Sequence, residues 1–295
     1  MGKRLLAPTN WVLEMSRNKK IAVLYHYGCK DGFGAAWAAW RKFGARAEYI
    51  GVNHDGFLPK NLSGKDVYLL DFGYPLGITK KLFNIVKSLT AIDHHISVEK
   101  STKSAHKYVY NLNHSGSVLA WKYFHSHRKT PLLLKHIEDI DIWKLALPNT
   151  RELMASLETY DLDFTLWNKI ARGWENPRLR KKYFAEGKAI LKYQNELIRK
   201  ALKDAEEVKF MGKRALVANF ALSLNSEIGD AMRKKGFQLG IIWQKRGDKI
   251  VVSLRSTNKV DSSKIAIKFG GGGHKKAASF RLPINQKFPW KRIKK

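Results

Sequence analysis

Acidic and imidazole side chains lie at or just after the ends of apolar runs in the first third of the chain. The set consists of His26, Asp31, Asp71, Asp93, His94 and His95. Carboxylates gathered in one crevice repel one another, and multivalent cations relieve that repulsion. Nitrogen and oxygen ligands without several thiolates favour Mn²⁺, Mg²⁺ or another hard-to-borderline ion over structural zinc. These residue types therefore indicate a metal site, provided that the fold brings them together.

The alternation of apolar runs and amphipathic stretches predicts a fold that brings these side chains together. Strands are expected at 20–25, 46–52, 67–72 and 89–92, with helices at 33–43 and 78–87. Such alternation is typical of a parallel sheet covered on both faces. Because the carboxyl ends of parallel strands lie on one side, the acids and imidazoles would converge there. Two cations about 3.5–4 Å apart form a common device for hydrolysing phosphate esters, so the residues alone predict a metal-dependent phosphoesterase.

The second half of the chain predicts a separate, smaller domain. After expected helices at 115–124, 131–140 and 163–173, one long helical pattern runs over 177–206. At about 1.5 Å per residue it would extend roughly 40 Å, and it is interpreted as a spacer between domains. Strands are expected at 215–219, 238–243 and 249–255, with helices at 225–234 and after the N-cap residue Asp261. The predicted class is α/β, with a parallel-sheet catalytic domain at 1–176, a linker helix at 177–206, a smaller mixed α/β domain at 207–283 and a basic tail at 284–295.

Charge and composition exclude several classes of protein. The 55 Lys and Arg against 25 Asp and Glu give a net charge of +30, which attracts polyanions and nucleic acid above all. An apolar content of 44% excludes intrinsic disorder, and no apolar stretch approaches the roughly 18 residues that a membrane span needs. The single cysteine excludes an intramolecular disulfide framework and fits a reducing compartment. A cytoplasmic protein without a membrane partner is therefore expected, with residues 291–295 fraying at the end.

Taken in order, the motifs resemble those of the DHH phosphoesterase superfamily, in its oligoribonuclease and cyclic-nucleotide phosphodiesterase-like branch. The resemblance rests on Asp93-His94-His95, on His26 with Asp31-Gly32, on Asp71, on the acidic block EDIDIW at 138–143 and on FGGGGH at 269–274. The last of these matches the DHH-associated C-terminal domain. The likeness covers residues 20–281, and several motifs in the expected order are far more specific than any one tripeptide.

The resemblance implies two Mn²⁺-type ions, with Mg²⁺ or another divalent ion as the alternative. By position, the implied metal ligands are His26, Asp31, Asp71, Asp93, His94 and Asp141, and the implied catalytic residues are Asp93, His94 and His95. His95 would orient the cluster or touch substrate. Asp139 stays open as an alternative to Asp141. Where relatives carry an earlier Asp, this chain has Cys29, which either replaces a ligand or is a packed loop cysteine.

Substrate binding is expected from the second domain. The residues concerned are Arg255, Gly271, Gly272, Gly273 and His274. Glycines let backbone N–H groups approach a phosphate closely, and the Arg255 guanidinium offers a planar fork for a phosphate. His274 would contact the scissile phosphate.

The function predicted from these features is a two-metal phosphodiesterase. Its substrates would be short oligonucleotides, single-stranded nucleic acid or cyclic nucleotides. One alternative is a pyrophosphatase or polyphosphatase of the same superfamily. Another is a basic nucleic-acid-binding protein whose catalytic site has decayed, which would bind in a salt-sensitive and chelator-indifferent way. A homodimer stays open.

Overall fold

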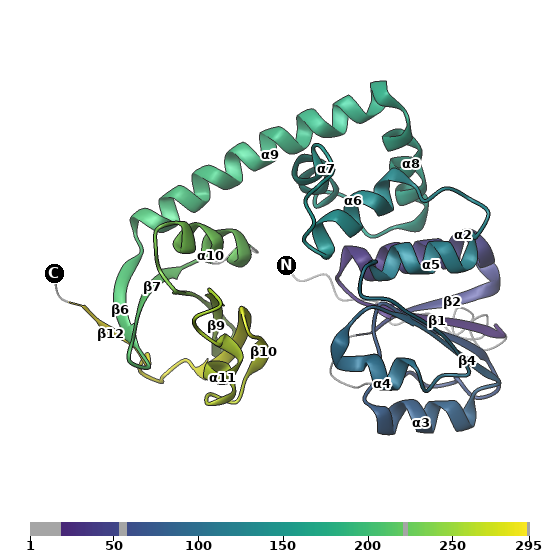
Figure 1. Cartoon of the computed structure of the whole chain (residues 1–295), viewed down its shortest axis with the longest axis horizontal. Coiled ribbons are helices and arrows are strands. Elements are labelled where there is room, and N and C mark those ends of the chain that lie inside the picture. The colour runs from purple at the N-terminus through teal and green to yellow at the C-terminus, as the bar shows by residue number, and fades with distance from the viewer. Residues whose placement is uncertain (1–18, 53–57, 221–223, 294–295) are drawn as a thin grey trace. The chain divides into compact units, whose positions relative to one another are not determined.

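The computed structural model describes residues 19–52, 58–220 and 224–293, with the side chain of His274 left out. The chain splits into two compact units, of which the first ends at Ala189 and the second begins at Ile190 (Figure 1). The division falls within helix α9, Pro177–Lys203, which runs from one unit into the other. The domain boundaries expected at 176, 206 and 283 stay predictions.

The first unit is built on a five-stranded sheet in which every neighbouring pair is parallel, as the sequence predicts. Its order is β2-β1-β3-β4-β5. The strands are β1 (Ile21–His26), β2 (Ala47–Val52), β3 (Asp66–Leu70), β4 (Ser88–Asp93) and β5 (Lys107–Tyr110). The short β5 was not expected, because its four residues at the sheet edge are half-buried or exposed and lack a continuous apolar run.

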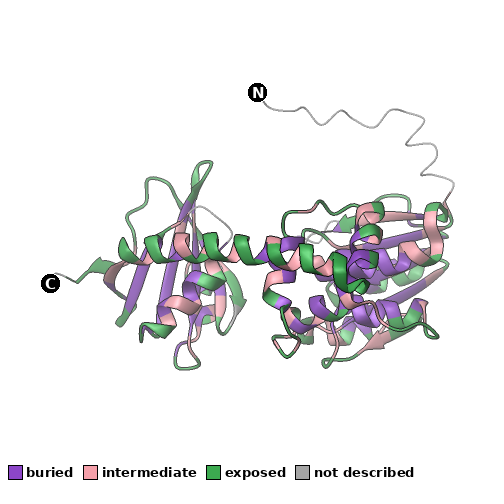
Figure 2. Ribbon diagram, turned by 90° about the horizontal axis from the view of Figure 1, so that it is seen from above, coloured by how far each residue is buried: buried purple, intermediate pink, exposed green. Residues whose placement is uncertain are grey.

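Helices cover both faces of this sheet (Figure 1). They are α2 (Lys30–Phe43), α3 (Leu76–Ile85), α4 (Glu99–Thr102), α5 (Gly116–Phe124), α6 (Leu132–Asp141), α7 (Thr150–Leu157) and α8 (Phe164–Glu175), with 3₁₀ turns η1 (Gly44–Arg46) and η2 (Ile96–Val98). Side chains of β1 alternate between two cores: Val23 packs with α2, and Ala22 and Leu24 pack with α3. The central strands are accordingly buried on both faces (Figure 2).

The second unit is a mixed α/β domain, which confirms the predicted class. Its seven-stranded sheet has the order β10-β11-β9-β8-β7-β6-β12, with β7 and β8 parallel and the other pairs antiparallel. The strands are β6 (Glu206–Phe210), β7 (Lys213–Asn219), β8 (Leu239–Arg246), β9 (Lys249–Ser256), β10 (Gly272–His274), β11 (Ala277–Pro283) and β12 (Lys291–Arg292), and the helices are α10 (Asn225–Lys234) and α11 (Ser262–Ile267).

The structure differs from the sequence expectation at both ends of this unit. Helix α9 ends at Lys203 rather than at 206, because Glu206 already pairs with Val217 as the start of β6. The expected frayed tail is also wrong for Lys291 and Arg292, which pair with β6 as strand β12. Trp290 packs edge-on against Phe210 at 6.0 Å between ring centroids, so aromatic packing anchors the segment.

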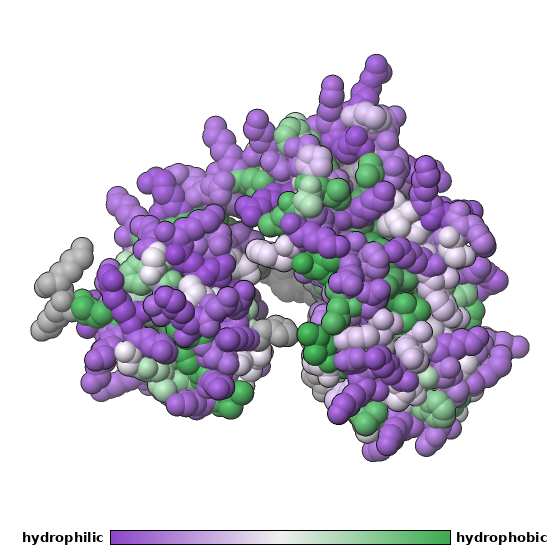
Figure 3. All heavy atoms as spheres, in the orientation of Figure 1, coloured by the Kyte–Doolittle hydropathy of each residue, from purple (hydrophilic) through white to green (hydrophobic). Residues whose placement is uncertain are grey.

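The surface is as polar as the amino-acid composition predicts. The face seen in Figure 3 is mostly hydrophilic, as expected for a chain with 27% charged residues. Within the described ranges, no helix combines the length and the apolar character needed to cross a membrane.

Candidate metal centre

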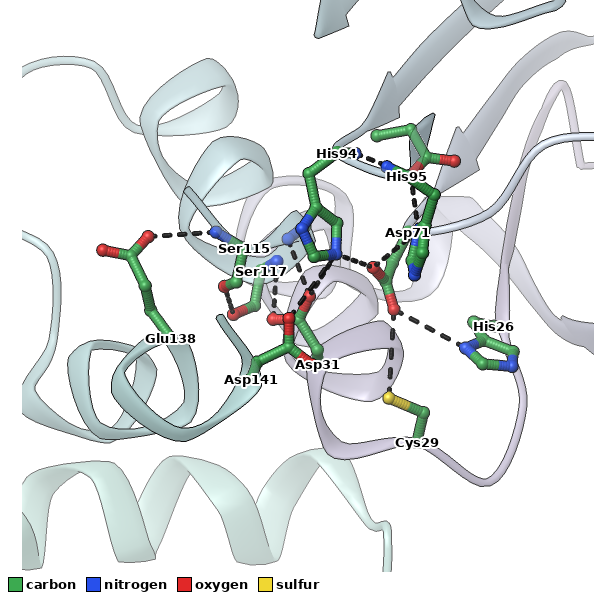
Figure 4. Close-up of polar contacts among 12 residues, drawn as sticks. His26, Cys29, Asp31, Asp71, His94, His95, Ser115, Ser117, Glu138 and Asp141 are labelled. Atoms are coloured by element: carbon green, nitrogen blue, oxygen red, sulfur yellow. Dashed lines mark hydrogen bonds and ion pairs between the residues drawn. The ribbon is translucent and has the colours of Figure 1, made fainter. Parts of the chain in front are cut away.

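The predicted acidic and imidazole residues of the first unit do converge at one edge of the parallel sheet (Figure 4). β1 ends at His26, Asp71 follows β3, and β4 ends at Asp93. Helices contribute the remaining carboxylates, since Asp31 lies in the first turn of α2 and Asp141 is the last residue of α6. Parallel topology is the reason, because all carboxyl ends of the strands lie on the same side.

Asp71 occupies the middle of the cluster in an unusual backbone conformation. Its φ is +61°, in the left-handed region that L-residues seldom adopt, and its side chain is 1% exposed. Its N–H donates to the carbonyl of Ile92 at 2.9 Å, which fixes the turn to β4. A Cβ at Gly116 would stand 2.5 Å from Oδ1 of Asp71, so only glycine leaves room for this carboxylate. Backbone strain of this kind gathers at functional sites.

Asp31 is held by the N-terminus of α5. Its Oδ2 accepts a hydrogen bond from the N–H of Gly116 at 2.6 Å, and its Oδ1 accepts one from the N–H of Ser117 at 3.0 Å. Free amide groups and the helix dipole both favour a carboxylate there. Sequence reasoning missed these two residues as supports of the site, although it expected a helix to begin at 115.

Asp93 fixes the two histidines that follow it. Its Oδ1 accepts hydrogen bonds from the N–H groups of His94 and His95 at 2.6 and 2.9 Å, and it pairs with Nδ1 of His95 at 2.8 Å. The hydrogen bond to Asp93 raises the pKa of His95. Oδ2 of Asp93 is buried and has no hydrogen-bond partner among the described residues. One oxygen of Asp93 therefore organises the turn, and the other remains available.

Three carboxylates surround the ring nitrogen of His94. Nε2 lies 3.3 Å from Oδ1 of Asp71, 3.5 Å from Oδ2 of Asp141 and 3.7 Å from Oδ2 of Asp31. These separations exceed ordinary hydrogen bonds, and the Nε2 and Asp71 Oδ1 atoms have no hydrogen-bond partner in the described part of the chain. Ligands bound at about 2.0–2.2 Å in a tetrahedron lie about 3.3–3.6 Å apart, so the spacing suits a shared cation.

A second group of donors lies on the other side of Asp71. Nδ1 of His26 is 3.7 Å and Sγ of Cys29 is 3.9 Å from Oδ2 of Asp71. The donor atoms of these three residues all lie within 4.8 Å of one another. Asp71 thus directs one oxygen to each group, so it could help to hold a cation at each.

The electrostatics of the cluster also fit cations. Burial and the neighbouring charges of Asp31 and Cys29 hold the pKa of Asp71 well above its usual range. Burial and the charge of Asp31 raise the pKa of Asp141 to about 7. Burial lowers the pKa of His94 and raises that of the Cys29 thiol. A bound cation favours the deprotonated form of all four groups, so it would oppose the raised pKa values of Asp71, Asp141 and Cys29, and it suits the neutral imidazole of His94.

The geometry shows which of Asp141 and Asp139 faces the cluster, a choice that the sequence left open. Asp139 is buried and accepts hydrogen bonds from the hydroxyl of Thr150 at 2.6 Å and from the N–H of Ala146 at 2.8 Å. It therefore caps the turn before α7. Asp141 faces His94 instead, and its side chain is 27% exposed. A further acid that sequence reasoning missed is Glu138, which accepts from the N–H of Ser115 at 3.0 Å and steadies the start of α5.

Arg255 belongs to the second unit and lies near the end of β9. Its Nε and Nη2 donate to the hydroxyl of Ser226 at 3.4 and 3.3 Å, and its Nη1 donates to the carbonyl of Leu254 at 3.0 Å. Burial lowers its pKa. No ion pair links this guanidinium to a carboxylate in the described ranges. A half-buried guanidinium of this kind suits an anionic ligand.

Backbone amides of the glycine run already form hydrogen bonds within the protein, unlike the amides of a loop that is free to bind phosphate. The N–H groups of Gly270 and Gly271 already donate to the carbonyls of Ile267 and Ala266, at 3.0 and 2.9 Å. Gly272 and Gly273 pair with β11 as part of β10, and His274 follows them there. A Cβ at Gly271 would meet the carbonyl oxygen of Ser279 at 2.1 Å, so close packing requires this glycine. The amide of Gly271 is therefore already engaged, the contacts of Gly272 and Gly273 to phosphate stay predictions, and the His274 side chain lies outside the described atoms.

Sequence comparison finds one matching family model and a viral relative. Residues 221–289 match the DHHA1 domain. The chain is 29% identical over 283 residues to an uncharacterized protein, R106, of Acanthamoeba polyphaga mimivirus. That match covers 87% of this chain and 66% of the viral protein, so the chain spans slightly less than two thirds of its relative.

Structure comparison finds the same two-part fold in several solved proteins. A DHH domain from a protein described as a member of a family of ribosomal proteins matches with a TM-score of 0.58 at 14% identity, over 90% of this chain and 83% of that one. A pGpG-specific phosphodiesterase of Vibrio cholerae matches with a TM-score of 0.53 at 12% identity, over 90% of this chain and 94% of that one. An exonuclease RecJ bound to manganese matches with a TM-score of 0.51 at 16% identity, over 92% of this chain and 88% of that one. At these identities, the likeness concerns the fold.

Proposed function

We propose that this chain is a phosphoesterase of the DHH superfamily, which its DHHA1 match and its fold support, and that it hydrolyses phosphodiester bonds with the help of two divalent cations. The observation that carries the proposal is the position of Asp71. Its two carboxylate oxygens face two separate groups of donor atoms, and both groups lie within the first unit.

The residues divide between two cation positions. Asp31, His94 and Asp141 would hold one cation together with Oδ1 of Asp71. His26 would hold the other together with Oδ2 of Asp71. When bound, the pair supplies Lewis-acid activation of water and offsets charge on phosphoryl oxygens. Asp31 is oriented for this role by the amides of Gly116 and Ser117.

His95 is positioned to contact the substrate. Its Nδ1 is engaged with Asp93, so Nε2 is the ring nitrogen left for a substrate, and the side chain is 37% exposed. Asp93 favours the protonated imidazole, which can donate a hydrogen bond to a phosphoryl oxygen or a proton to the leaving oxygen. Asp93 therefore acts on the reaction by holding His95 and His94 in place.

The proposed substrates are short oligonucleotides or single-stranded nucleic acid, with Mn²⁺ as the proposed ion. The net charge of +30 favours polyanions, and Arg255 offers a guanidinium without an acidic partner among the described residues. Proteins with this fold include one described as a pGpG-specific phosphodiesterase and one described as an exonuclease bound to manganese. The single cysteine fits a reducing, cytoplasmic location, which is part of the same proposal.

A substrate panel tests the proposal. Dinucleotides, cyclic dinucleotides, single-stranded DNA and RNA, pyrophosphate and polyphosphate are each incubated with the full chain and Mn²⁺, with and without chelator. Hydrolysis of oligonucleotides that chelator abolishes is the expected result. Cleavage of polyphosphate or pyrophosphate alone would show that the substrate class is wrong. Chelator-insensitive binding without any hydrolysis would show a site that has lost its activity.

A further inference from the structure

Cys29 places a thiol beside the cation position of His26. It is the residue before α2, and its side chain forms no capping hydrogen bond to that helix. Its Sγ instead points toward Oδ2 of Asp71, at 3.9 Å, and His26 approaches the same oxygen at 3.7 Å (Figure 4). Tetrahedral ligands at about 2.0–2.3 Å from an ion lie about 3.3–3.8 Å apart, so the thiol stands near ligand distance.

Asp71 supplies an independent indication that a ligand belongs here. Its carboxylate is 1% exposed, and Oδ2 meets Nδ1 of His26 at 3.7 Å and the weak donor Sγ of Cys29 at 3.9 Å, neither as short as an ordinary N–H or O–H hydrogen bond. A buried carboxylate without a full set of partners is costly, and a cation shared between its oxygens removes that cost. A cation drawn to Oδ2 would meet the sulfur of Cys29 and the ring nitrogen of His26 at once.

We propose that Cys29 binds, as a thiolate, the cation that His26 and Asp71 hold, so that the two metal positions differ in chemistry. This inference rests on the proposed function. One position offers sulfur, nitrogen and oxygen, and the other offers nitrogen and oxygen only. Thiolate ligands favour zinc and other soft-to-borderline ions, whereas carboxylate-rich sites suit manganese and magnesium. Binding forms a metal–sulfur bond and releases the thiol proton to solvent. The two positions would therefore differ in the ion that each binds most tightly.

Cobalt titration of the metal-free full chain tests this inference without any measurement of activity. A thiolate bound to Co²⁺ gives a charge-transfer band in the near ultraviolet. Cys29 is the only cysteine in the sequence, so that band has one possible source. The band is expected to grow up to one equivalent of bound ion, while the visible bands of Co²⁺ continue to grow toward two. Cys29→Ser and Cys29→Asp should both lose the near-ultraviolet band, and Cys29→Asp should still bind two ions.

A protection experiment supports the titration. Zn²⁺ should shield the Cys29 thiol from alkylation in the wild-type chain, and Mg²⁺ at the same concentration should shield it far less. Two bound cobalt ions without a thiolate band would overturn the role of Cys29 and leave the proposed function intact. Failure of the folded chain to bind any divalent ion would instead overturn the proposed function. Circular dichroism of each variant identifies any that fail to fold.

A basic pocket at the other end of α2 carries a second, independent inference. It has a volume of about 410 Å³. Arg41, Arg128 and Arg172 line it, together with Lys129 and Lys135. Glu175 is the acidic residue of the lining, and its Oε1 already accepts a hydrogen bond from the N–H of Leu132 at 2.7 Å. Ten residues of helix separate Arg41 from Asp31, or roughly 15 Å at about 1.5 Å per residue, so the pocket lies apart from the metal centre.

The charges in this pocket are not balanced within the protein. None of the three arginines forms an ion pair with an acid in the described ranges. Burial and the like charges of Arg128 and Arg172 lower the pKa of Arg41. Trp37 and Trp121 stack at 5.4 Å beneath the pocket, but both are buried, so the site offers charge rather than a surface for base stacking. Guanidinium groups gathered in this way suit phosphate.

We infer that this pocket binds backbone phosphates of single-stranded nucleic acid, outside the metal centre. Arg128 and Arg172 are exposed, so Arg128→Glu with Arg172→Glu leaves the core untouched. The matched control is Lys80→Glu with Lys81→Glu, which makes the same charge change at exposed positions of α3. Binding of a labelled oligonucleotide is measured against salt concentration with chelator present. Each lost phosphate contact reduces the slope of log affinity against log salt by about 0.7, so the pocket variant should lose about 1.4.

The comparison between the two variants decides the outcome. The pocket variant should bind more weakly than the control and with the shallower salt slope. Equal loss in the two variants would show that only net charge matters, and the pocket would then not be a binding site. Binding that both variants retain in full would contradict the inference as well.

Discussion

The carboxyl edge of the first sheet and the glycine-rich end of the second unit are both rich in motif residues, yet their polar groups are used differently. At the first edge, Asp71 and His94 are crowded together with buried atoms that lack hydrogen-bond partners among the described residues. In the second region, the amides of Gly270 and Gly271 are already bonded to α11. Buried polar groups without protein partners indicate a role in ligand binding, whereas paired groups indicate a structural role.

The largest effect should come from Asp71→Ala, because this side chain serves both cation positions. Hydrolysis should fall by about three orders of magnitude or more, since ligands of one metal pair act as a unit. The initial rate with Mn²⁺ measures it. The control is Asp66→Ala at the opposite end of β3, where the carboxylate accepts from the hydroxyl of Ser88 at 2.7 Å. Comparable activity in these two variants would show that hydrolysis does not depend on Asp71.

Arg255→Ala should act on substrate affinity rather than on turnover. Charge-assisted hydrogen bonds are worth roughly 1.5–3 kcal/mol, so KM should rise about 10- to 100-fold while kcat changes little. Steady-state kinetics on a dinucleotide measure both. Arg214→Ala is the matched control, because this exposed arginine pairs with Glu207 at 2.8 Å. A fall in kcat with KM unchanged would assign Arg255 to the chemical step.

Two glycine substitutions should affect different properties, one of them metal binding and the other stability. At Gly116 a methyl group would stand 2.5 Å from Oδ1 of Asp71, so Gly116→Ala should weaken metal binding, by roughly 10- to 100-fold. At Gly271 it would stand 2.1 Å from the carbonyl of Ser279, so Gly271→Ala should cost about 1–3 kcal/mol of stability and leave metal binding unchanged. Calorimetric metal titration and urea unfolding measure the two effects. Gly77→Ala, with open space around it, is the control.

The last prediction concerns pH. The pKa of Asp141 is raised to about 7 in the folded, metal-free chain, so the folded state keeps a proton that the unfolded state has lost. Stability contributed by this proton is full at low pH and is lost as pH rises from about 4 to about 7. Asp141→Asn should therefore melt at a higher temperature than wild type at pH 8 and close to it at pH 4. Saturating Mn²⁺ should remove the wild-type deficit, and melting curves that differ equally at both pH values would contradict the shift.

Much of the site was predictable because parallel topology follows from local patterns. Apolar runs that end in Asp71 and Asp93 fix both the strands and the side of the sheet on which their acids lie. The left-handed backbone of Asp71 was not predictable, since it depends on the contact with Gly116 across the fold. The role of α5 in holding Asp31 is equally non-local, because the two partners of that hydrogen bond are 85 positions apart in the sequence.

Helix geometry explains the ambiguity within the acidic block. Asp139 and Asp141 lie two residues apart on α6, so at about 100° per residue their side chains point to nearly opposite sides. Sequence spacing cannot tell which side faces the cluster until the rotation of the helix is known. At the C-terminus, the aromatic residues Phe288 and Trp290 were the overlooked signal, because they pack into the second unit and hold β12 in place.

Anomalous scattering from crystals soaked in Mn²⁺ tests the central claim most directly. The account predicts two peaks in the first unit, one beside each carboxylate oxygen of Asp71, with His94 at one and His26 at the other. A single peak away from Asp71, or the absence of any peak beside it in a saturated crystal, would contradict it.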